Sequence, residues 1–92
     1  MEIEVEKTKQ GLKITRFEAR ILDKQGDSLK GLDELAMLLV DVDYNREIFD
    51  MDMTVFAKDI GENGEIKMTG LTDSIAVLAI DKHGNESKPI IV

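Results

Sequence analysis

The chain has 92 residues, which is enough for one small domain with a single hydrophobic core and too few for a second one. It contains no cysteine, so disulfides, thiolate metal sites and a cysteine nucleophile are excluded. The formal charge of −7 argues against a nonspecific grip on nucleic acid, because phosphate binding draws on clustered lysines and arginines. No segment has the length of a membrane span or the apolar core of a signal peptide, and we expect a cytoplasmic domain without membrane contact.

The charge is unevenly distributed along the chain. Residues 1–31 carry seven basic and six acidic side chains, a net of +1, whereas residues 32–92 carry five basic and thirteen acidic ones, a net of −8. A contact with DNA would therefore have to use the first third, with Lys7, Lys9, Lys13, Arg16, Arg20 and Lys24. Cations mixed with glutamates in this way are typical of a solvated strand face, and we do not expect direct DNA contact.

The first two predicted strands are residues 2–8 and 12–23, where apolar and polar residues alternate. In the second, Leu12 and Ile14 follow one phase and Phe17 follows the other. This slip around residues 15–16 predicts a β-bulge and a strand that could serve two sheets. A turn at residues 24–27 follows. Its pattern, Asp and Lys before glycine and Asp after it, recurs in similar form at residues 80–87, where a second turn is predicted.

The middle of the chain predicts a helical turn and two further strands. Helical spacing of leucines favours a turn near residues 31–35, and the apolar run that follows predicts a central strand at 35–43, covered on both faces. Residues 44–47 then form a loop into a half-buried strand at 48–56, where apolar residues alternate with Asp and Thr.

Three more strands complete the chain. The turn Glu62-Asn63-Gly64 predicts a hairpin into a short strand with Ile66 and Met68. Residues 74–81 are apolar in both phases and predict the most buried strand, and Pro89 places the last strand, 88–92, at a sheet edge. About seven short strands predict one all-β domain, an antiparallel β-sandwich of the immunoglobulin/fibronectin-like class. We expect a core that includes Leu38, Val40, Phe49, Met51, Val77 and Leu78.

The only histidine, His83, lies between Asp81 and Ser87, which raises the possibility of a hydrolase triad. Nucleophilic catalysis needs a histidine held by an orienting partner in a water-poor pocket. A hairpin tip next to Gly84 provides none of this. We expect an exposed turn residue and no catalytic or cofactor-binding residue in the chain.

The acidic stretch 41–52 contains the candidates for a metal site. Aligned to a twelve-residue calcium loop, Asp41, Asp43 and Asn45 supply oxygens at positions one, three and five, and Asp52 stands at position twelve. Position six is Arg46 where glycine makes the sharp turn, and Asp52 is shorter than the usual bidentate glutamate. These departures favour an acidic hairpin without a metal, and calcium binding stays the alternative.

Two resemblances add to this interpretation. The segment "VLAIDKHGNES", 77–87, resembles the penultimate strand and final hairpin of fibronectin type III and bacterial Ig-like domains, with their V-x-A-x-D-x-x-G-N-x-S pattern. Most of the chain resembles the C-terminal accessory domain of site-specific adenine DNA methyltransferases, the Mod-type subunits of restriction-modification systems. The matches are 35–44 ("LAMLLVDVDY"), 49–52 ("FDMD") and 81–86 ("DKHGNE").

The second resemblance implies a noncatalytic domain of a larger bacterial protein. Adenine methyltransferases need a D-P-P-Y-type tetrapeptide and a glycine-rich loop for S-adenosylmethionine, and the chain has neither, with Pro89 as its only proline. The expected partners are the rest of the parent methyltransferase or a restriction subunit, and no cofactor is expected in this domain. The alternative is an Ig-like spacer or adhesion module of a bacterial surface protein.

Overall fold

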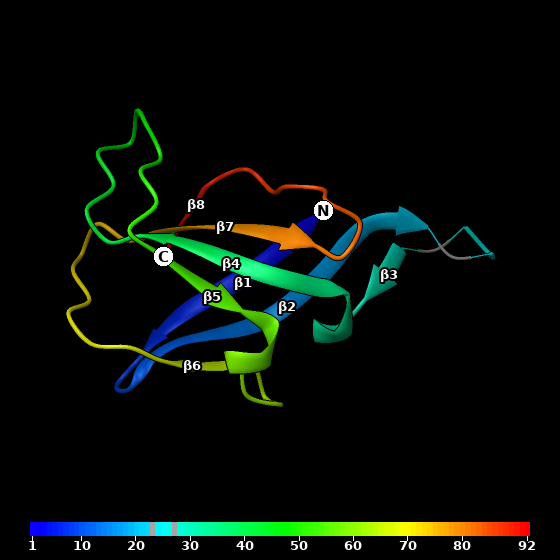
Figure 1. Ribbon diagram of the computed structural model, residues 1–92, viewed down its shortest axis with the longest axis horizontal. Helices are drawn as coiled ribbons and strands as arrows, with labels where there is room; N and C mark the ends of the chain where they lie inside the picture. The colour runs from blue at the N-terminus through cyan, green and yellow to red at the C-terminus, as the bar shows by residue number, and fades with distance from the viewer. Residues whose placement is uncertain (23, 27) are drawn as a thin grey trace.

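The computed structural model describes residues 1–22, 24–26 and 28–92, and for residues 20–22 and 28–30 it describes the backbone alone. The chain forms two antiparallel sheets packed face to face (Figure 1). The strands are β1 (Glu2–Thr8), β2 (Gly11–Leu22), β3 (Ser28–Lys30), β4 (Leu35–Asp41), β5 (Met53–Phe56), β6 (Glu65–Lys67), β7 (Ala76–Asp81) and β8 (Ile90–Ile91). Within the described ranges the helical pieces are two 3-10 turns, η1 (Leu32–Glu34) and η2 (Ala57–Asp59), and no helix is long and apolar enough to cross a membrane.

The strand order is that of a Greek key. In the first sheet β2 lies between β1 on one side and β3 and β6 on the other, and the second sheet has the order β5-β4-β7-β8. The central strands β2 and β4 thus pair with β6 and β7, which follow much later in the chain. The predicted all-β sandwich is confirmed, with eight strands where about seven were expected, and the short β3 is the additional one.

The predicted bulge in β2 is present. In the β1–β2 pairing Glu4 lies opposite Arg16 and Val5 lies opposite Ile14, so Thr15 has no partner residue across the ladder. The extra residue lets Ile14 and Phe17 both point into the core although they are three positions apart. The prediction that this strand serves both sheets is wrong, because β6 and β3 occupy successive parts of its second edge within one sheet.

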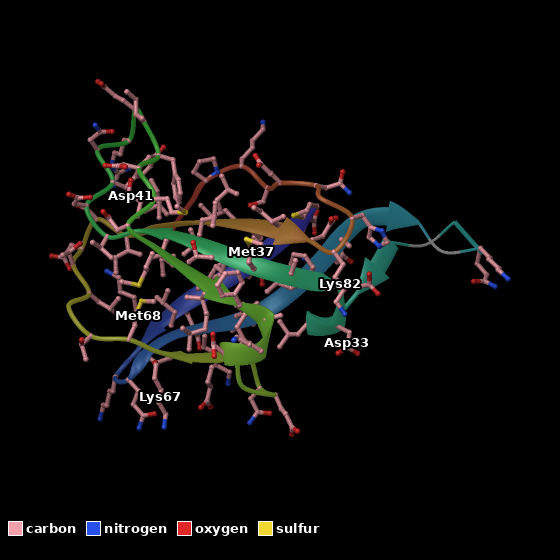
Figure 2. All side chains as sticks on the ribbon, in the orientation of Figure 1. Asp33, Met37, Asp41, Lys67, Met68 and Lys82 are labelled. Carbon is pink, nitrogen blue, oxygen red and sulfur yellow. The ribbon has the colours of Figure 1, made fainter. Side chains whose placement is uncertain are left out.

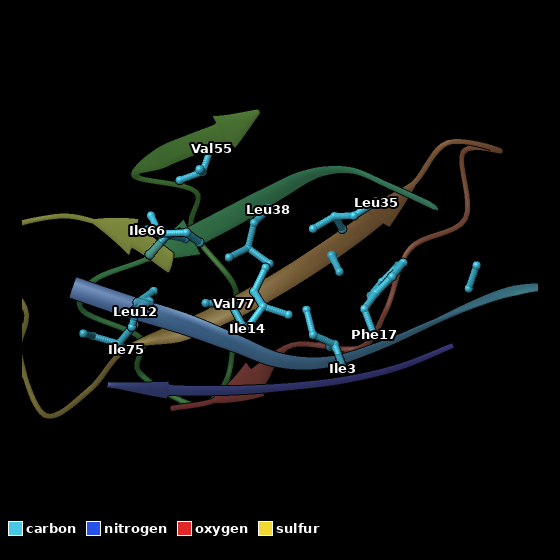
Figure 3. Close-up of a cluster of buried hydrophobic side chains, with 13 residues drawn as sticks. Ile3, Leu12, Ile14, Phe17, Leu35, Leu38, Val55, Ile66, Ile75 and Val77 are labelled. Carbon is cyan, nitrogen blue, oxygen red and sulfur yellow. The ribbon is translucent and has the colours of Figure 1, made fainter. Parts of the chain in front are cut away.

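The core lies between the two sheets and is built from the inward side chains of both (Figure 3). Its members are Ile3, Leu12, Ile14, Phe17, Ala19, Leu35, Leu38, Val40, Val55, Ile66, Ile75, Val77 and Ala79. Leu38, Val40 and Val77 are fully buried, as predicted. Burial of each large aliphatic side chain contributes about 1.5–3 kcal/mol relative to exposure, so these positions dominate the stability of the domain.

Three predicted core residues lie elsewhere. Met51 is 53% exposed, and Phe49 packs beside Tyr44 in the loop that joins β4 to β5, with 6.2 Å between ring centroids. The predicted strand over 48–56 begins only at Met53, because side-chain oxygens bind the amides of this loop and replace a ladder. Leu78 is half-buried and points away from the core, opposite Leu39 on β4.

The remaining predictions concern turns and the last strand. The Asn-Gly turn is present, with Gly64 at φ 80°, but it does not join a hairpin, since β6 pairs with β2 in the other sheet from β5. Pro89 precedes the edge strand β8, as predicted. The turn at 24–27 involves Asp23 and Asp27, which lie outside the described residues, whereas the similar turn at 80–87 is described in full.

Candidate functional site

Three of the four metal-ligand candidates meet at the end of β4. The carboxylates of Asp41, Asp43 and Asp52 each place an oxygen within 4.8 Å of the others. Asp41 is buried, at 1% exposure, and the other two are exposed. Asn45 Oδ1 instead accepts the backbone amides of Glu47 and Ile48, at 2.9 and 3.0 Å.

Two carboxylates of this acidic cluster (Asp41, Asp43 and Asp52) hold the loop through its backbone. Asp41 accepts the amides of Asp43 at 3.0 Å and Asp50 at 2.8 Å, and Asp52 accepts the amide of Val42 at 2.9 Å. These bonds satisfy amides that a strand ladder would otherwise engage. Arg46 at the tip has φ 70°, so it adopts the left-handed conformation that a glycine takes more easily.

The cluster shifts two pKa values in opposite directions. The amide of Asp50 is the largest of the influences that lower the pKa of Asp41, because hydrogen bonds to a carboxylate favour its charged form. The pKa of Asp43 is raised, first by its hydrogen bond with the Asp41 carboxylate and next by the negative charge of Asp52. The geometry therefore explains the loop conformation, and acidic clusters of this kind also occur without any ion.

The structure does not assemble a triad around His83. The Asp81 carboxylate accepts the backbone amides of His83 and Asn85, at 2.8 and 2.9 Å, and the side-chain amide of Asn85 at 3.0 Å. The Ser87 hydroxyl makes two hydrogen bonds to the backbone: it accepts one from the amide of Ala79 and donates one to the carbonyl oxygen of Lys88. His83 is exposed, with Nε2 3.5 Å from a carboxylate oxygen of Glu34. Asp81 thus shapes the turn and is not available to orient an imidazole.

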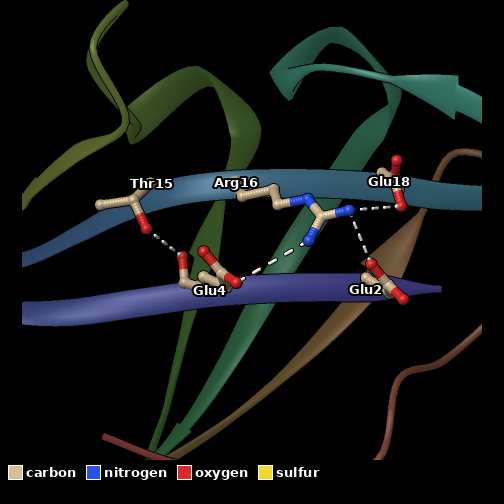
Figure 4. A network of polar contacts seen from close by, with 5 residues as sticks. All are labelled: Glu2, Glu4, Thr15, Arg16 and Glu18. Atoms are coloured by element: carbon tan, nitrogen blue, oxygen red, sulfur yellow. Dashed lines mark hydrogen bonds and ion pairs between the residues drawn. The ribbon is translucent and has the colours of Figure 1, made fainter.

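Two cations of the first third, Arg16 and Lys13, lie among carboxylates on the outer face of the first sheet, whereas Lys7 donates a hydrogen bond to the carbonyl of Thr72 at 2.7 Å. Arg16 lies 2.9 Å from Glu2, 3.2 Å from Glu18 and 3.8 Å from Glu4 (Figure 4), and Glu18, followed by Glu2, raises its pKa. Lys13 stands opposite glutamates of both neighbouring strands. This is the solvated face of mixed charge that the sequence predicted. The side chain of Arg20 is outside the described residues.

The outer face of the second sheet has the opposite character, and this surface was missed by the sequence reasoning. Apart from Thr54, which lies opposite Leu39, its outward side chains are apolar: Met37 and Leu39 on β4, Phe56 on β5, Leu78 and Ile80 on β7, and Ile91 on β8. The signal was visible in the runs at 35–40 and 75–80, which are apolar in both phases. They led us to expect cover on both faces, whereas Figure 1 shows no further layer of the described chain in front of β4 and β7.

An open groove of about 560 Å3 runs between β1 and the segment before β8. Its lining includes Glu2, Glu4, Arg16, Glu86 and Lys88. Within this lining Arg16 pairs with Glu2 and Glu4, so the charges of these three residues are already engaged with one another.

No protein-family profile matches the chain, and no curated protein or solved structure matches it with significance.

Proposed function

We propose that this domain is a noncatalytic protein-interaction module, and that its parent protein is a site-specific adenine DNA methyltransferase of a restriction-modification system. The observation that carries the first part is the contrast between the two outer faces of the sandwich. Antiparallel sheets with one solvated face alternate apolar-in and polar-out, as β1 and β2 do. The strands β4 and β7 are apolar on both sides, which is the pattern of a sheet that packs against something on each face.

The choice of parent protein rests on the resemblance and on where its segments lie. Residues 35–41 form β4, residues 49–52 lead back into β5, and residues 81–86 form the turn after β7. All three belong to the second sheet or border it. A surface that joins this domain to the catalytic part, or to a restriction subunit, would use the same sheet. Such a domain needs no cofactor of its own and acts in the cytoplasm.

The coding sequence upstream of Met1 tests the parent assignment. A D-P-P-Y-type tetrapeptide and a glycine-rich loop for S-adenosylmethionine are expected there. A signal peptide followed by tandem sandwich domains would instead identify a surface spacer and overturn the assignment.

The mode of action is tested by a gel shift of the domain with duplex DNA at low salt. We expect no shift, because Arg16 and Lys13 of β2 lie among glutamates. A shift that is lost in Lys9→Gln or Lys13→Gln variants would replace the protein-interaction role by a DNA-binding one.

A further inference from the structure

We propose that the outer face of the second sheet binds a partner protein through an apolar segment with lysine or arginine side chains at one end. This inference deepens the proposed function and rests on it. The apolar face is defined by the residues Met37, Leu39, Phe56, Leu78, Ile80 and Ile91.

The strand register makes these side chains one continuous surface. Leu39 lies opposite Leu78, and Met37 lies between Ile80 on one neighbouring strand and Phe56 on the other. Directly opposed residues on one face of a sheet are close enough for side-chain contact. In Figure 2 Met37 is labelled near the middle of β4, with Asp41 at the far end of the same strand.

None of these side chains contributes to the core. They are absent both from the buried cluster and from the partly buried side chains that pack on it. Phe56 is 48% and Ile91 46% exposed, and the others are half-buried by their neighbours on the sheet. The surface continues toward the β4–β5 loop, because Thr54 on β5 donates a hydrogen bond to the sulfur of Met51 at 3.2 Å. Met51 is itself exposed.

The size of the apolar face limits what can occupy it. Strands that rise about 3.3 Å per residue and lie about 4.8 Å apart give it an area of about 300–400 Å2. Each side of a standard stable interface buries about 800 Å2. Two copies packed face to face through this surface alone would therefore not form a stable dimer, and an occupant must also contact the rim.

The charge of the rim selects the occupant. Residues 41–52, at one end of the face, carry five carboxylates and one guanidinium. Asp41, Asp43 and Asp52 place carboxylate oxygens within 4.8 Å of one another there, so a cation placed beside them would be favourable. A second copy would instead bring another chain of net charge −7 against this end. The complementary partner has an apolar centre and a basic end that meets this loop.

The experiment uses a synthetic peptide of alternating leucine and lysine as the probe, titrated into the domain and followed by amide NMR shifts at low salt. Shifts are expected on β4, β5 and β7. Leu78→Thr is expected to weaken binding about tenfold, as loss of a central apolar contact does. Asp43→Asn is expected to weaken it about two- to fivefold by removing a rim charge. The matched control Glu4→Thr, on the outer face of the first sheet, should leave the affinity unchanged.

Several outcomes would overturn the inference. These are no binding, shifts confined to β1, β2 and β6, an affinity that Leu78→Thr leaves intact, or equal binding of a leucine–glutamate peptide. Self-association in sedimentation that is lost in Leu78→Thr would assign the face to a second copy and would also overturn it. If the peptide does not bind, the assignment of the parent protein can still be tested by the coding sequence upstream of Met1. If that sequence encodes a signal peptide, the parent assignment is overturned and the measured peptide binding still stands.

Discussion

The amide of Ile14 on β2 donates to the carbonyl oxygen of Gly64 at 2.9 Å, and the two backbones approach closely at this point. A Cβ atom on Gly64 would lie 2.3 Å from the carbonyl oxygen of Ile14, and the glycine has φ 80°. The Asn-Gly turn therefore docks onto the first sheet through a position that has no room for a side chain. Its role is the attachment of β6 beside β2.

Replacement of Gly64 by alanine should lower the free energy of unfolding by about 2–4 kcal/mol, since a backbone clash adds to the strain of positive φ. Gly84 is the matched control: it has φ 85°, and a Cβ atom placed on it would meet no heavy atom within 4 Å. Gly84→Ala should cost only about 1 kcal/mol. Urea denaturation of both variants measures the difference, and equal losses would contradict the docking role of Gly64.

Deletion of Thr15 should leave the domain folded. Without the unpaired residue, Val5 would still face Ile14, Glu4 would still face Arg16, and the inward positions of β2 would simply alternate. The loss is the hydrogen bond from the Thr15 hydroxyl to the carbonyl of Glu4, at 3.3 Å, together with the local bend. We expect destabilisation of no more than about 2 kcal/mol by urea denaturation.

Deletion of Lys13 is the control for this prediction. It would make Leu12 and Ile14 adjacent, so that one of these two core residues must turn toward solvent. The expected cost exceeds about 3 kcal/mol, since burial of a core side chain and the pairing with β6 are both lost. The idea of a register-neutral bulge fails if the two deletions are equally harmful.

The stability of the domain should depend on pH through the acidic cluster. The pKa of Asp43 is raised above its ordinary value of 3.8, so its ionised form opposes folding, and this penalty is relieved as the pH falls toward 3.8. The pKa of Asp41 is lowered, so its contribution is present above 3.8 and is lost as the pH falls through its value in the folded state. Stability should therefore rise slightly on mild acidification and then fall.

Two variants separate these effects. Asp43→Asn should raise the free energy of unfolding near neutral pH, with a gain that shrinks as the pH approaches 3.8. Asp41→Asn should lower it near neutral pH, because an amide has one acceptor oxygen for the two backbone donors. Glu47→Gln, in the same loop, serves as the control and should leave both the free energy of unfolding and its pH dependence unchanged. A gain for Asp43→Asn that does not vary with pH would speak against the proposed origin.

Asp81→Ala should destabilise the domain far more than His83→Ala. The aspartate is buried and accepts three hydrogen bonds from its turn, so its removal should cost about 2–4 kcal/mol. The exposed histidine should be replaceable within about 0.5 kcal/mol. Thermal unfolding of the two variants is sufficient, and a large effect of His83→Ala would require a role for its contact with Glu34.

The fold could be predicted because its strands alternate in the ordinary way. The inward positions of β1 and β2, including the phase change between Ile14 and Phe17, were readable from the sequence, as was the edge position after Pro89. The loop 42–52 was not readable. Asp and apolar residues alternate there whether the carboxylates face solvent beside a strand or bind backbone amides, as Asp41 and Asp52 do.

The candidate site was predictable only in part. The sequence brought Asp41, Asp43 and Asp52 together as candidates, and their carboxylates do meet, yet nothing in the pattern distinguished Asn45, which caps the loop instead. The apolar face was missed because a run such as that around Leu39 was taken to mean cover on both sides. Which layers surround a strand depends on how far the chain extends on each side of the sheet, and a local pattern does not contain that information.

The Greek-key order has a consequence for how the domain is made. The hairpin of β1 and β2 joins neighbours in sequence. The pairings of Leu12 with Ile66 and of Leu39 with Leu78 can form only after most of the chain has been synthesised. Pairings between such distant segments are slow to form, and β4 must wait for β7 with both of its apolar sides unprotected. The strand β4, which supplies part of the apolar face of the finished domain, is therefore also the part of the nascent chain most prone to aggregation.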